Sequence, residues 1–152
     1  MAVTNLLEPQ NDHVKRIAAF AIDAVAAAND TLVDTDQPGR GTISVRAGFH
    51  CGPCCANVLG NLNPRFCLFG DVVNCSSRIE STSKPNKIQC SQRAALLLEE
   101  QWPEVNVTKR GVVNIKGKGE MVCFWVNEKS RDSSADSRWS ANRSTHRDRF
   151  DP

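Results

Sequence analysis

Apolar residues recur at helical spacing in three stretches of the chain. The longest stretch begins at Asp12 and ends near Asn29, and we expect Asp12 to cap its N-terminus. Its apolar stripe consists of Val14, Ile17, Ala18, Ala21, Ile22, Val25 and Ala28. The pattern also predicts a helix over residues 72–80 and another from a Ser91 cap to about Gln101.

Short apolar runs outside these helices predict strands. From Thr42 to His50 every second residue is apolar, which indicates a half-buried strand. Gly111 separates two later runs, and residues 117–119 separate the second of them from the last run. The predicted strands cover residues 2–7, 42–50, 65–69, 87–90, 105–109, 112–116 and 121–126.

This mixture of helices and strands predicts an α+β or α/β domain, which we place at residues 1–127. Residues 128–152 differ in composition, because they mix charges, serine and arginine with few bulky apolar groups. A segment of this kind buries too little apolar surface to offset the entropy of ordering it. We therefore predict a disordered polar tail at residues 128–152.

A chain of 152 residues is long enough for one domain with a substantial core. Its net charge of +2 indicates neither nucleic acid nor an anionic membrane as a partner. No apolar run is long enough to cross a bilayer, and the N-terminus lacks the pattern of a signal peptide. We therefore expect a cytoplasmic location without direct membrane contact, in which the seven cysteines are reduced.

Residues 51–54 read Cys-Gly-Pro-Cys, the dithiol motif of thioredoxin-like proteins. That chemistry needs a helix directly after the motif, because the helix N-terminus lowers the pKa of the first cysteine. Residues 55–59 leave room for barely one helical turn before the turn signals of residues 60–64. Zinc is the other possible ligand, bound by His50, Cys51, either Cys54 or Cys55, and Cys67. A structural zinc site usually shows two paired sets of ligands, and only one pair is visible here. Packing of small residues is the favoured interpretation, and thiol–disulfide chemistry and zinc binding are the alternatives.

Several blocks occur in the order and spacing of a known family. Residues 64–81 read PRFCLFGDVVNCSSRIES and closely resemble PRYCLFGDTVNTASRMES, a segment typical of class III nucleotide cyclases and of guanylate cyclases in particular. Residues 45–53 resemble the family's hydrophobic-R-x-G-x-H-x-G-P pattern, and residues 110–119 resemble its RG…KGKG pattern. Phe124-Trp125 is similar to the closing strand. The likeness covers about residues 1–127, and it places the Cys-Gly-Pro-Cys string on the H-x-G-P turn.

The resemblance implies the ferredoxin-like α+β sandwich of the class III adenylyl and guanylyl cyclases, without its first strands. It also implies a lyase that converts GTP to cyclic GMP and pyrophosphate in intracellular signalling. In that reaction the ribose 3′-oxygen attacks the α-phosphate and expels pyrophosphate. Charge develops on the phosphate oxygens, so fixed hydrogen-bond donors beside them stabilise the transition state.

Four residues take expected roles from the family's motifs. Asn74 is expected to position the ribose, and Arg78, four residues later on the same helical face, to support the α-phosphate in the transition state. Lys116 is expected to hold the β- and γ-phosphates, with Lys118 as a less favoured substitute. Cys67 matches a purine-contacting position at which guanylate cyclases tend to carry Cys and adenylate cyclases Asp, so it favours GTP. Taken singly, each residue also fits an ordinary surface helix, hairpin turn or small core position.

The family holds two metal ions, Mg²⁺ or Mn²⁺, with two aspartates in segments that precede the equivalent of Met1. Asp12, Asp23 and Asp71 do not correspond to those aspartates. We therefore expect the ligands on a missing N-terminal segment or on a partner chain, and we expect this chain to be inactive alone. Met1 is then expected to reflect a fragment. Loss of the family's central first strand also predicts unpaired sheet edges and an open core.

The resemblance further implies a head-to-tail dimer, homo- or heterodimeric, with GTP at its interface. This chain would supply the Asn, Arg and Lys half of one active site. An upstream receptor domain, common in the family, would make it the cytoplasmic part of a membrane-bound receptor cyclase. The alternative from another class is a non-catalytic, regulatory cyclase-like subunit that dimerises and binds nucleotide weakly.

Overall fold

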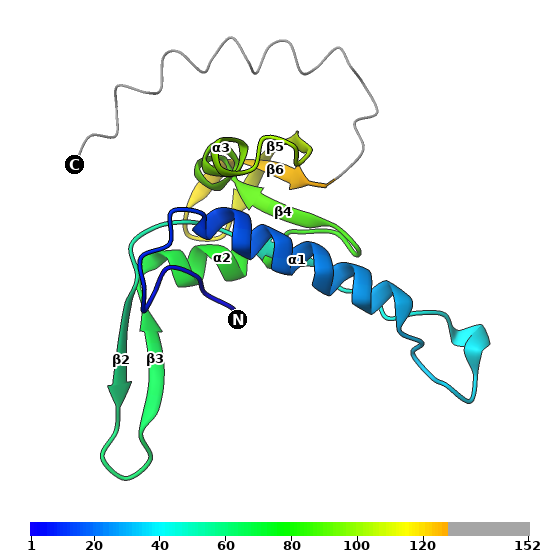
Figure 1. The fold of residues 1–152 in the computed structure, drawn as a ribbon, viewed down its shortest axis with the longest axis horizontal. Coiled ribbons are helices and arrows are strands. Elements are labelled where there is room, and N and C mark those ends of the chain that lie inside the picture. The colour runs from blue at the N-terminus through cyan, green and yellow to red at the C-terminus, as the bar shows by residue number, and fades with distance from the viewer. Residues whose placement is uncertain (128–152) are drawn as a thin grey trace.

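A computed structural model describes residues 1–127, which form three α-helices, a short 3-10 helix and six strands (Figure 1). The predicted tail, residues 128–152, lies outside the described residues. In chain order the elements are α1 (His13–Asp30), η1 (Pro38–Arg40), β1 (Ala47–Phe49), β2 (Cys55–Leu59), β3 (Arg65–Phe69), α2 (Asp71–Ser81), β4 (Ile88–Ser91), α3 (Gln92–Gln101), β5 (Val107–Ile115) and β6 (Gly119–Val126).

Four strands form the main sheet in the order β1-β4-β6-β5. β1 runs parallel to β4, whereas the other neighbours are antiparallel. α1 and α3 pack on one face around Phe49, Leu98 and Phe124, and α2 packs on the other through Cys75 and Ile79. The α+β class predicted from the sequence pattern is confirmed. Within residues 1–127 no strand pairs with the outer side of β1, which is therefore an edge strand of the main sheet.

The helices follow the predicted apolar spacing closely. Ser91 caps α3 as predicted, because its Oγ accepts a hydrogen bond from the backbone N–H of Ala94 at 3.3 Å. The predicted cap of α1 by Asp12 is wrong, since that carboxylate pairs with Arg16 at 2.7 Å. A side chain of α3 instead satisfies a backbone N–H in the first turn of α1: Gln101 Oε1 accepts a hydrogen bond from the N–H of Val14 at 2.9 Å.

The predicted strand over residues 2–7 is absent, and these residues form bends. Local hydrogen bonds replace a strand partner, because the amide side chains and backbones of Asn5 and Gln10 bind each other at 2.6 and 3.0 Å. The predicted strand over residues 42–50 is shorter in the structure. Only β1 forms, and it pairs with β4 over three residues.

Residues 55–59, which the sequence limited to one helical turn, form strand β2. They pair antiparallel with β3 in a hairpin that projects from the body of the domain (Figure 1). The two predicted strands around Gly111 are one strand, β5, with a bulge between Lys109 and Gly111. Gly111 has φ +117°, so it bends the strand instead of ending it. Among the described residues no helix combines the length and apolarity needed to span a membrane.

Candidate active site

The position at which α2 starts is set by a tight glycine turn directly after β3. Gly70, at φ +139°, joins the two elements, and a Cβ there would lie 2.8 Å from the carbonyl oxygen of Pro53. Only glycine fits both the backbone angle and this approach. This glycine turn fixes where α2 begins, and therefore where its exposed face carries Asn74 and, one helical turn later, Arg78.

Arg78 lies against the turn between β5 and β6. A Cβ on Gly117 would lie 3.0 Å from Nη1 of Arg78, so the guanidinium occupies the space beside that glycine. Gly117 has φ +70°, and the turn also carries Lys116 and Lys118. The structure therefore brings the predicted Arg78 and the lysine–glycine segment together, although they are far apart in the sequence.

A second contact ties the same turn to the start of α2. Lys118 Nζ binds Asp71 Oδ2 at 2.5 Å, while the backbone N–H of Lys118 donates to Ile115 O at 2.9 Å. Lys118 therefore has a carboxylate partner, and Lys116 is exposed at the opposite end of the turn. Sequence reasoning set Asp71 aside because it does not match a metal-binding position. An Asp that opens a helix could have been noted as a partner for a basic turn.

The other two predicted residues lie nearby along the chain but are not joined to Arg78 by a direct contact. Asn74 is exposed on α2, and Cys67 is half-buried on β3, where it pairs in register with Asn57. Cys67 precedes the start of α2 by four residues, so β3 and Gly70 set its distance from that helix.

His50 lies on the same face of the sheet as α2, beside this cluster. Its Nδ1 is 2.6 Å from Ser91 Oγ. Because that hydroxyl oxygen also accepts from Ala94, its hydrogen is available to His50. Burial lowers the pKa of His50, the positive charge of Arg93 lowers it further, and Asp71 opposes both. The ring is therefore neutral near pH 7 and adds no positive charge to the site.

The dithiol interpretation does not fit the geometry. β2 follows the motif where a redox protein needs a helix, and all seven cysteines are free. Cys51 is buried, and burial raises the pKa of its thiol, which is the opposite of what a nucleophilic thiolate requires. Cys51 belongs to the buried cluster around Phe49, which agrees with the packing interpretation for this residue, whereas Cys55 is exposed.

Within residues 1–127, no three side chains of His, Cys, Asp or Glu gather closely enough to hold a metal ion. The zinc alternative around His50 is therefore not favoured by the geometry of the described residues. The same residues do not fit the two-ion site that the family resemblance implies.

Comparison with known proteins agrees with the geometry. A sequence model of the adenylate and guanylate cyclase catalytic domain matches residues 1–128. The receptor-type guanylate cyclase gcy-27 of Caenorhabditis elegans is 40% identical over 121 residues, which are 80% of this chain and 16% of that protein. The chain thus spans about a sixth of that relative's length.

Solved structures show the same fold. The guanylate cyclase domain of RhGC from Catenaria anguillulae, in complex with GTP, superposes with a TM-score of 0.72 at 33% identity. The match covers 84% of this chain and 66% of that domain. A dimeric guanylyl cyclase domain of the RhoGC fusion protein from Blastocladiella emersonii gives a TM-score of 0.68 at 30% identity, covering 84% of this chain and 65% of that one.

Proposed function

The chain belongs to the adenylate and guanylate cyclase catalytic domain family, and from that premise we propose that it supplies half of a nucleotide cyclase active site. The proposed reaction converts GTP to cyclic GMP and pyrophosphate. The ribose 3′-oxygen forms a bond to the α-phosphorus, and the bond from that phosphorus to the pyrophosphate oxygen breaks.

One observation supports this proposal most strongly: the guanidinium of Arg78 rests against Gly117, in the turn that carries Lys116 and Lys118. Half-buried Arg78 of α2 thus lies against a turn that carries two exposed lysines, and cationic donors of this kind suit a triphosphate. Asp71 neutralises Lys118, so we assign the β- and γ-phosphates to Lys116. Lys118 holds the turn against α2.

The planar guanidinium of Arg78 suits the negative charge that develops on the α-phosphate oxygens in the transition state. Its planar group carries a permanent charge and several donors, so it can follow the α-phosphate oxygens as their charge grows. Asn74, one turn earlier on α2, is assigned to the ribose through its amide. Cys67 is assigned to the purine, where its weak S–H donor suits the guanine carbonyl better than the adenine amine.

The metal ligands belong to another polypeptide in this proposal. Because the described residues do not fit a two-ion site, Mg²⁺ or Mn²⁺ would be held by the second cyclase domain or by sequence outside this chain. The chain alone is therefore proposed to be inactive. We place the complex in the cytoplasm, either free or as part of a receptor cyclase.

The test is complementation between two domains. This chain is mixed with a complete guanylate cyclase domain that lacks its own transition-state arginine, and cyclic GMP is measured with GTP and Mn²⁺. We expect cyclic GMP only from the mixture. Arg78→Ala should lower the rate by about 10²–10³-fold, as removal of one transition-state donor does elsewhere. Arg16→Ala, on exposed α1, is the matched control and should leave the rate unchanged.

The regulatory alternative predicts a different result from the same experiment. If the two domains associate, shown by sedimentation, but no cyclic GMP forms, the chain is a non-catalytic partner. A rate that is equal with Arg78 and with Ala at that position would contradict the assigned half-site even if product appears.

A further inference from the structure

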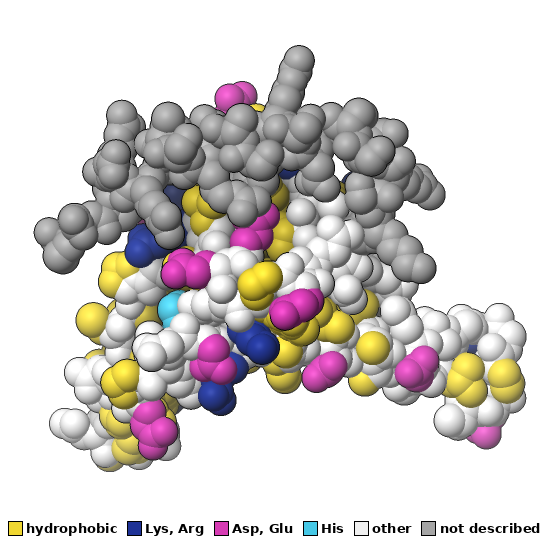
Figure 2. Space-filling view, turned by 45° about the horizontal axis from the view of Figure 1, so that its top comes forward, with side chains coloured by type: hydrophobic (Ala, Val, Ile, Leu, Met, Phe, Trp, Pro, Cys, Tyr) yellow, Lys and Arg dark blue, Asp and Glu magenta, His cyan; other side chains and the backbone are white. Residues whose placement is uncertain are grey.

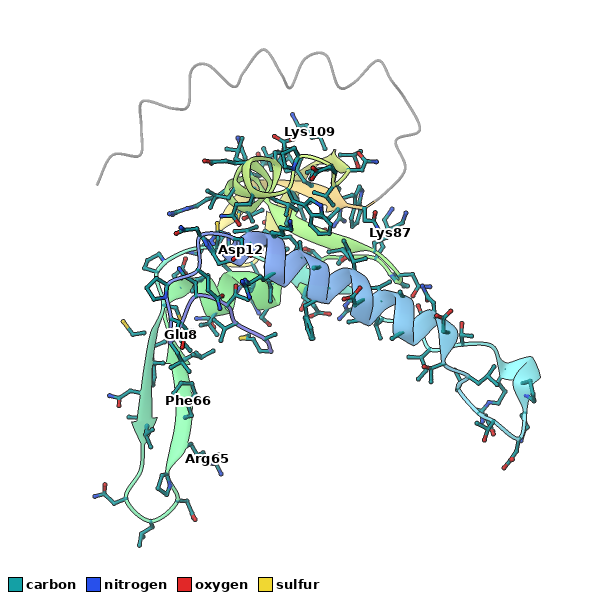
Figure 3. All side chains as sticks on the ribbon, in the orientation of Figure 1. Glu8, Asp12, Arg65, Phe66, Lys87 and Lys109 are labelled. Carbon is teal, nitrogen blue, oxygen red and sulfur yellow. The ribbon has the colours of Figure 1, made fainter. Side chains whose placement is uncertain are left out.

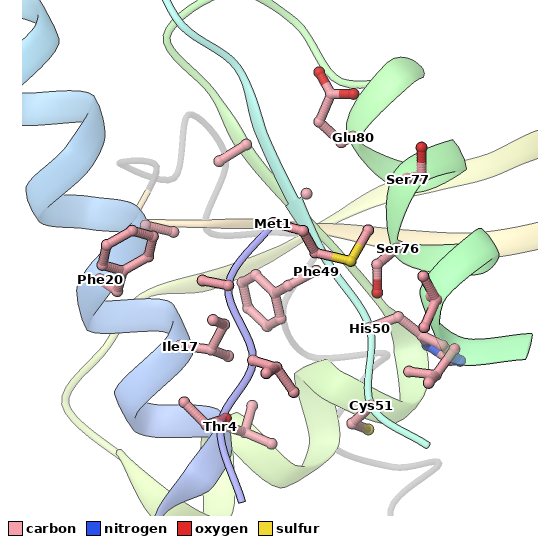
Figure 4. Close-up of a pocket in the computed structure, with 18 of the residues that line it drawn as sticks. Met1, Thr4, Ile17, Phe20, Phe49, His50, Cys51, Ser76, Ser77 and Glu80 are labelled. Atoms are coloured by element: carbon pink, nitrogen blue, oxygen red, sulfur yellow. The ribbon is translucent and has the colours of Figure 1, made fainter. Parts of the chain in front are cut away.

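The helix that carries Asn74 and Arg78 has one open side. Ser76, Ser77 and Glu80 of α2 line a hollow of about 690 Å³ that lies between this helix and α1 (Figure 4). The position of α2 therefore depends on the other elements that it contacts. β1 and β4 of the sheet are two of these elements, and the hairpin formed by β5 and β6 is the third.

Arg110 reaches α2 from the bulge in β5. The register of β5 against β6 shifts between Lys109 and Gly111, so Arg110 is the extra residue of the bulge. A bulge of this kind changes the direction of the side chain that it carries. Gly111, at φ +117°, provides the backbone conformation that the bulge needs. The arginine–glycine pair of the family resemblance is therefore the bulge itself, and the proposed function gives it no role.

The guanidinium of Arg110 joins β5 to the C-terminal end of α2. Its carbon lies 4.6 Å from the centre of the Trp125 ring, which is close enough for a cation–π interaction. Its Nη1 donates a hydrogen bond to the backbone oxygen of Thr82 at 2.7 Å. Thr82 is the C-cap residue of α2, and a cation is favourable there because the helix dipole places partial negative charge at that end.

Thr82 is bonded in turn to Arg78. Its backbone N–H donates to Arg78 O at 3.1 Å, and its hydroxyl donates to the same oxygen at 3.1 Å. That hydroxyl also accepts a hydrogen bond at 3.1 Å from Nε2 of Gln89, a fully buried side chain of β4. Thr82 therefore connects two strands of the sheet to the turn of α2 that carries Arg78.

The same hairpin holds the start of α2 through the ion pair of Lys118 and Asp71. That carboxylate is 63% exposed, and an ion pair in contact with water contributes little alone. Arg110 is half-buried, so its bond to the helix end is the stronger of the two. With Gly117 beside Arg78, the hairpin contacts α2 at its start, at the guanidinium and at its end.

We propose that Arg110 is a positioning residue for Arg78. Through Thr82 it fixes the last turn of α2, so that the guanidinium of Arg78 stays beside Gly117. The consequence for catalysis rests on the proposed function, which assigns Arg78 to the α-phosphate. Because Arg78 acts on charge that develops only in the transition state, loss of Arg110 should lower kcat for GTP and leave KM unchanged.

The first test uses the complementation assay with Arg110→Met, which keeps an apolar stem and removes the charge and the donors. We expect kcat to fall at least about tenfold with KM within about twofold, since a displaced transition-state donor loses part of its 10²–10³-fold effect. Arg110→Lys keeps a cation at the helix end and should stay within about threefold of the unmodified chain. Lys109→Met, at the exposed neighbouring residue of β5, is the control and should change neither constant. Equal losses in Arg110→Met and Arg110→Lys, or no loss in Arg110→Met, would overturn the proposal.

A double-mutant cycle shows whether Arg110 acts through Arg78. Where Arg78 is already replaced by alanine, Arg110→Met should lower the remaining rate less than about twofold, because the group that it positions is absent. A further tenfold loss in that background would mean that Arg110 acts on another group, and it would overturn the proposal.

Two measurements without GTP separate this inference from the proposed function. In Arg110→Met, amide hydrogen exchange at Thr82 should be at least about tenfold faster, because local opening of the last turn becomes easier. The NMR order parameter of the Arg78 Nε–H should fall as well. Both should stay unchanged in Lys109→Met. Thr82→Val, which removes the hydroxyl bonded to Arg78 and keeps the side-chain shape, repeats the test if Arg110→Met fails to fold.

These nucleotide-free results decide the proposal by themselves. If both change as expected but the unmodified chain forms no cyclic GMP with its partner domain, the proposed function fails and the positioning of Arg78 by Arg110 stands. If neither changes, the positioning role is wrong even where cyclic GMP is formed.

Discussion

Arg78 and Gly117 depend on each other at the scale of single residues. The guanidinium lies beside the space where any other residue would carry its Cβ, with Nη1 3.0 Å from that position. Both partners lie outside the core, so hydrophobic patterning says nothing about their contact. The family motifs indicated Arg78 and the lysine–glycine segment separately, and the structure supplies the contact between them.

Gly117→Ala should therefore impair the cyclase reaction more than its backbone strain explains. The new Cβ would lie 3.0 Å from Arg78 Nη1, so the guanidinium would have to shift by a few tenths of an ångström from its position beside the turn. Gly119→Ala is the control, because that glycine has φ +74° against +70° for Gly117 and open space around its Cβ. We expect the complementation rate to fall at least about tenfold further for Gly117→Ala, given that arginine donors of this kind contribute 10²–10³-fold.

Gly117→Ala and Gly119→Ala together separate backbone strain from the contact with Arg78. If both variants lose the same activity, as measured by cyclic GMP per associated dimer, strain in the turn is the cause and Arg78 is not held by Gly117. Thermal unfolding of both variants checks that the turn strain is comparable.

Cys67 carries the second prediction at this scale. A thiol is a weak donor, whereas an ionised Asp only accepts hydrogen bonds. Cys67→Asp should therefore raise the ratio of ATP to GTP turnover in the complemented dimer, because the adenine amine donates and the guanine carbonyl accepts. The measurement is cyclic AMP and cyclic GMP formed from equal nucleotide concentrations. Cys55→Asp, at an exposed cysteine on β2, should leave the ratio unchanged. A ratio that stays constant in Cys67→Asp would remove Cys67 from base recognition.

At the scale of elements, the close approach of α2 to β1 depends on Gly48. A Cβ there would lie 2.3 and 2.4 Å from the backbone N and Cα of Glu80, which no side-chain movement can relieve. Gly48→Ala should therefore lower the free energy of unfolding by roughly 2 kcal/mol or more, within the range of core overpacking. Gly39→Ala meets nothing within 4 Å and should be neutral or stabilising by up to about 1 kcal/mol.

Urea unfolding of the two variants measures this difference. Equal stability in Gly48→Ala and Gly39→Ala would mean that α2 can move away from β1 to accommodate the new Cβ.

The elements that sequence predicted well are those fixed by local chemistry. α3 has a Ser91 cap and a periodic stripe, and both features act within a few residues. The wrong predictions concern segments whose conformation depends on pairing with residues distant in the sequence. Residues 55–59 become a strand because β3 pairs with them, and residues 2–7 bend because no strand within residues 1–127 does. Gly111 was interpreted as a break, but pairing with β6 carries the strand through it as a bulge.

The candidate site shows the same limit. Motif resemblance indicated Asn74, Arg78, Lys116 and Cys67, and their assigned roles stay predictions until activity is measured. The pairing of Lys118 with Asp71 could not be predicted, because it joins positions 47 residues apart whose closeness depends on how β5 and β6 approach α2. Long-range contacts of this kind need the fold itself.

At the scale of the whole molecule, the hairpin β2–β3 extends far from the sheet (Figure 1). Phe66 and Arg65 lie on its projecting arm (Figure 3), and hydrophobic side chains are visible over the arm in the space-filling view (Figure 2). Leu62 at its tip is 96% exposed and Phe66 is 59% exposed. Exposed apolar side chains on a hairpin that projects from the rest of the domain indicate a contact with another polypeptide.

Phe66→Asp should therefore weaken association with a second cyclase domain. An aromatic side chain buried in such a contact contributes strongly, and a carboxylate in its place would have to be desolvated without a partner. We expect the dissociation constant, measured by sedimentation, to rise at least about tenfold. Val112→Asp is the control, because Val112 on β5 is 61% exposed but lies away from the hairpin.

Cyclic GMP formation should fall with Phe66→Asp and recover at high protein concentration, because the half-site itself is unchanged. A loss that concentration does not restore would show that the arm contributes to the site itself and not only to association.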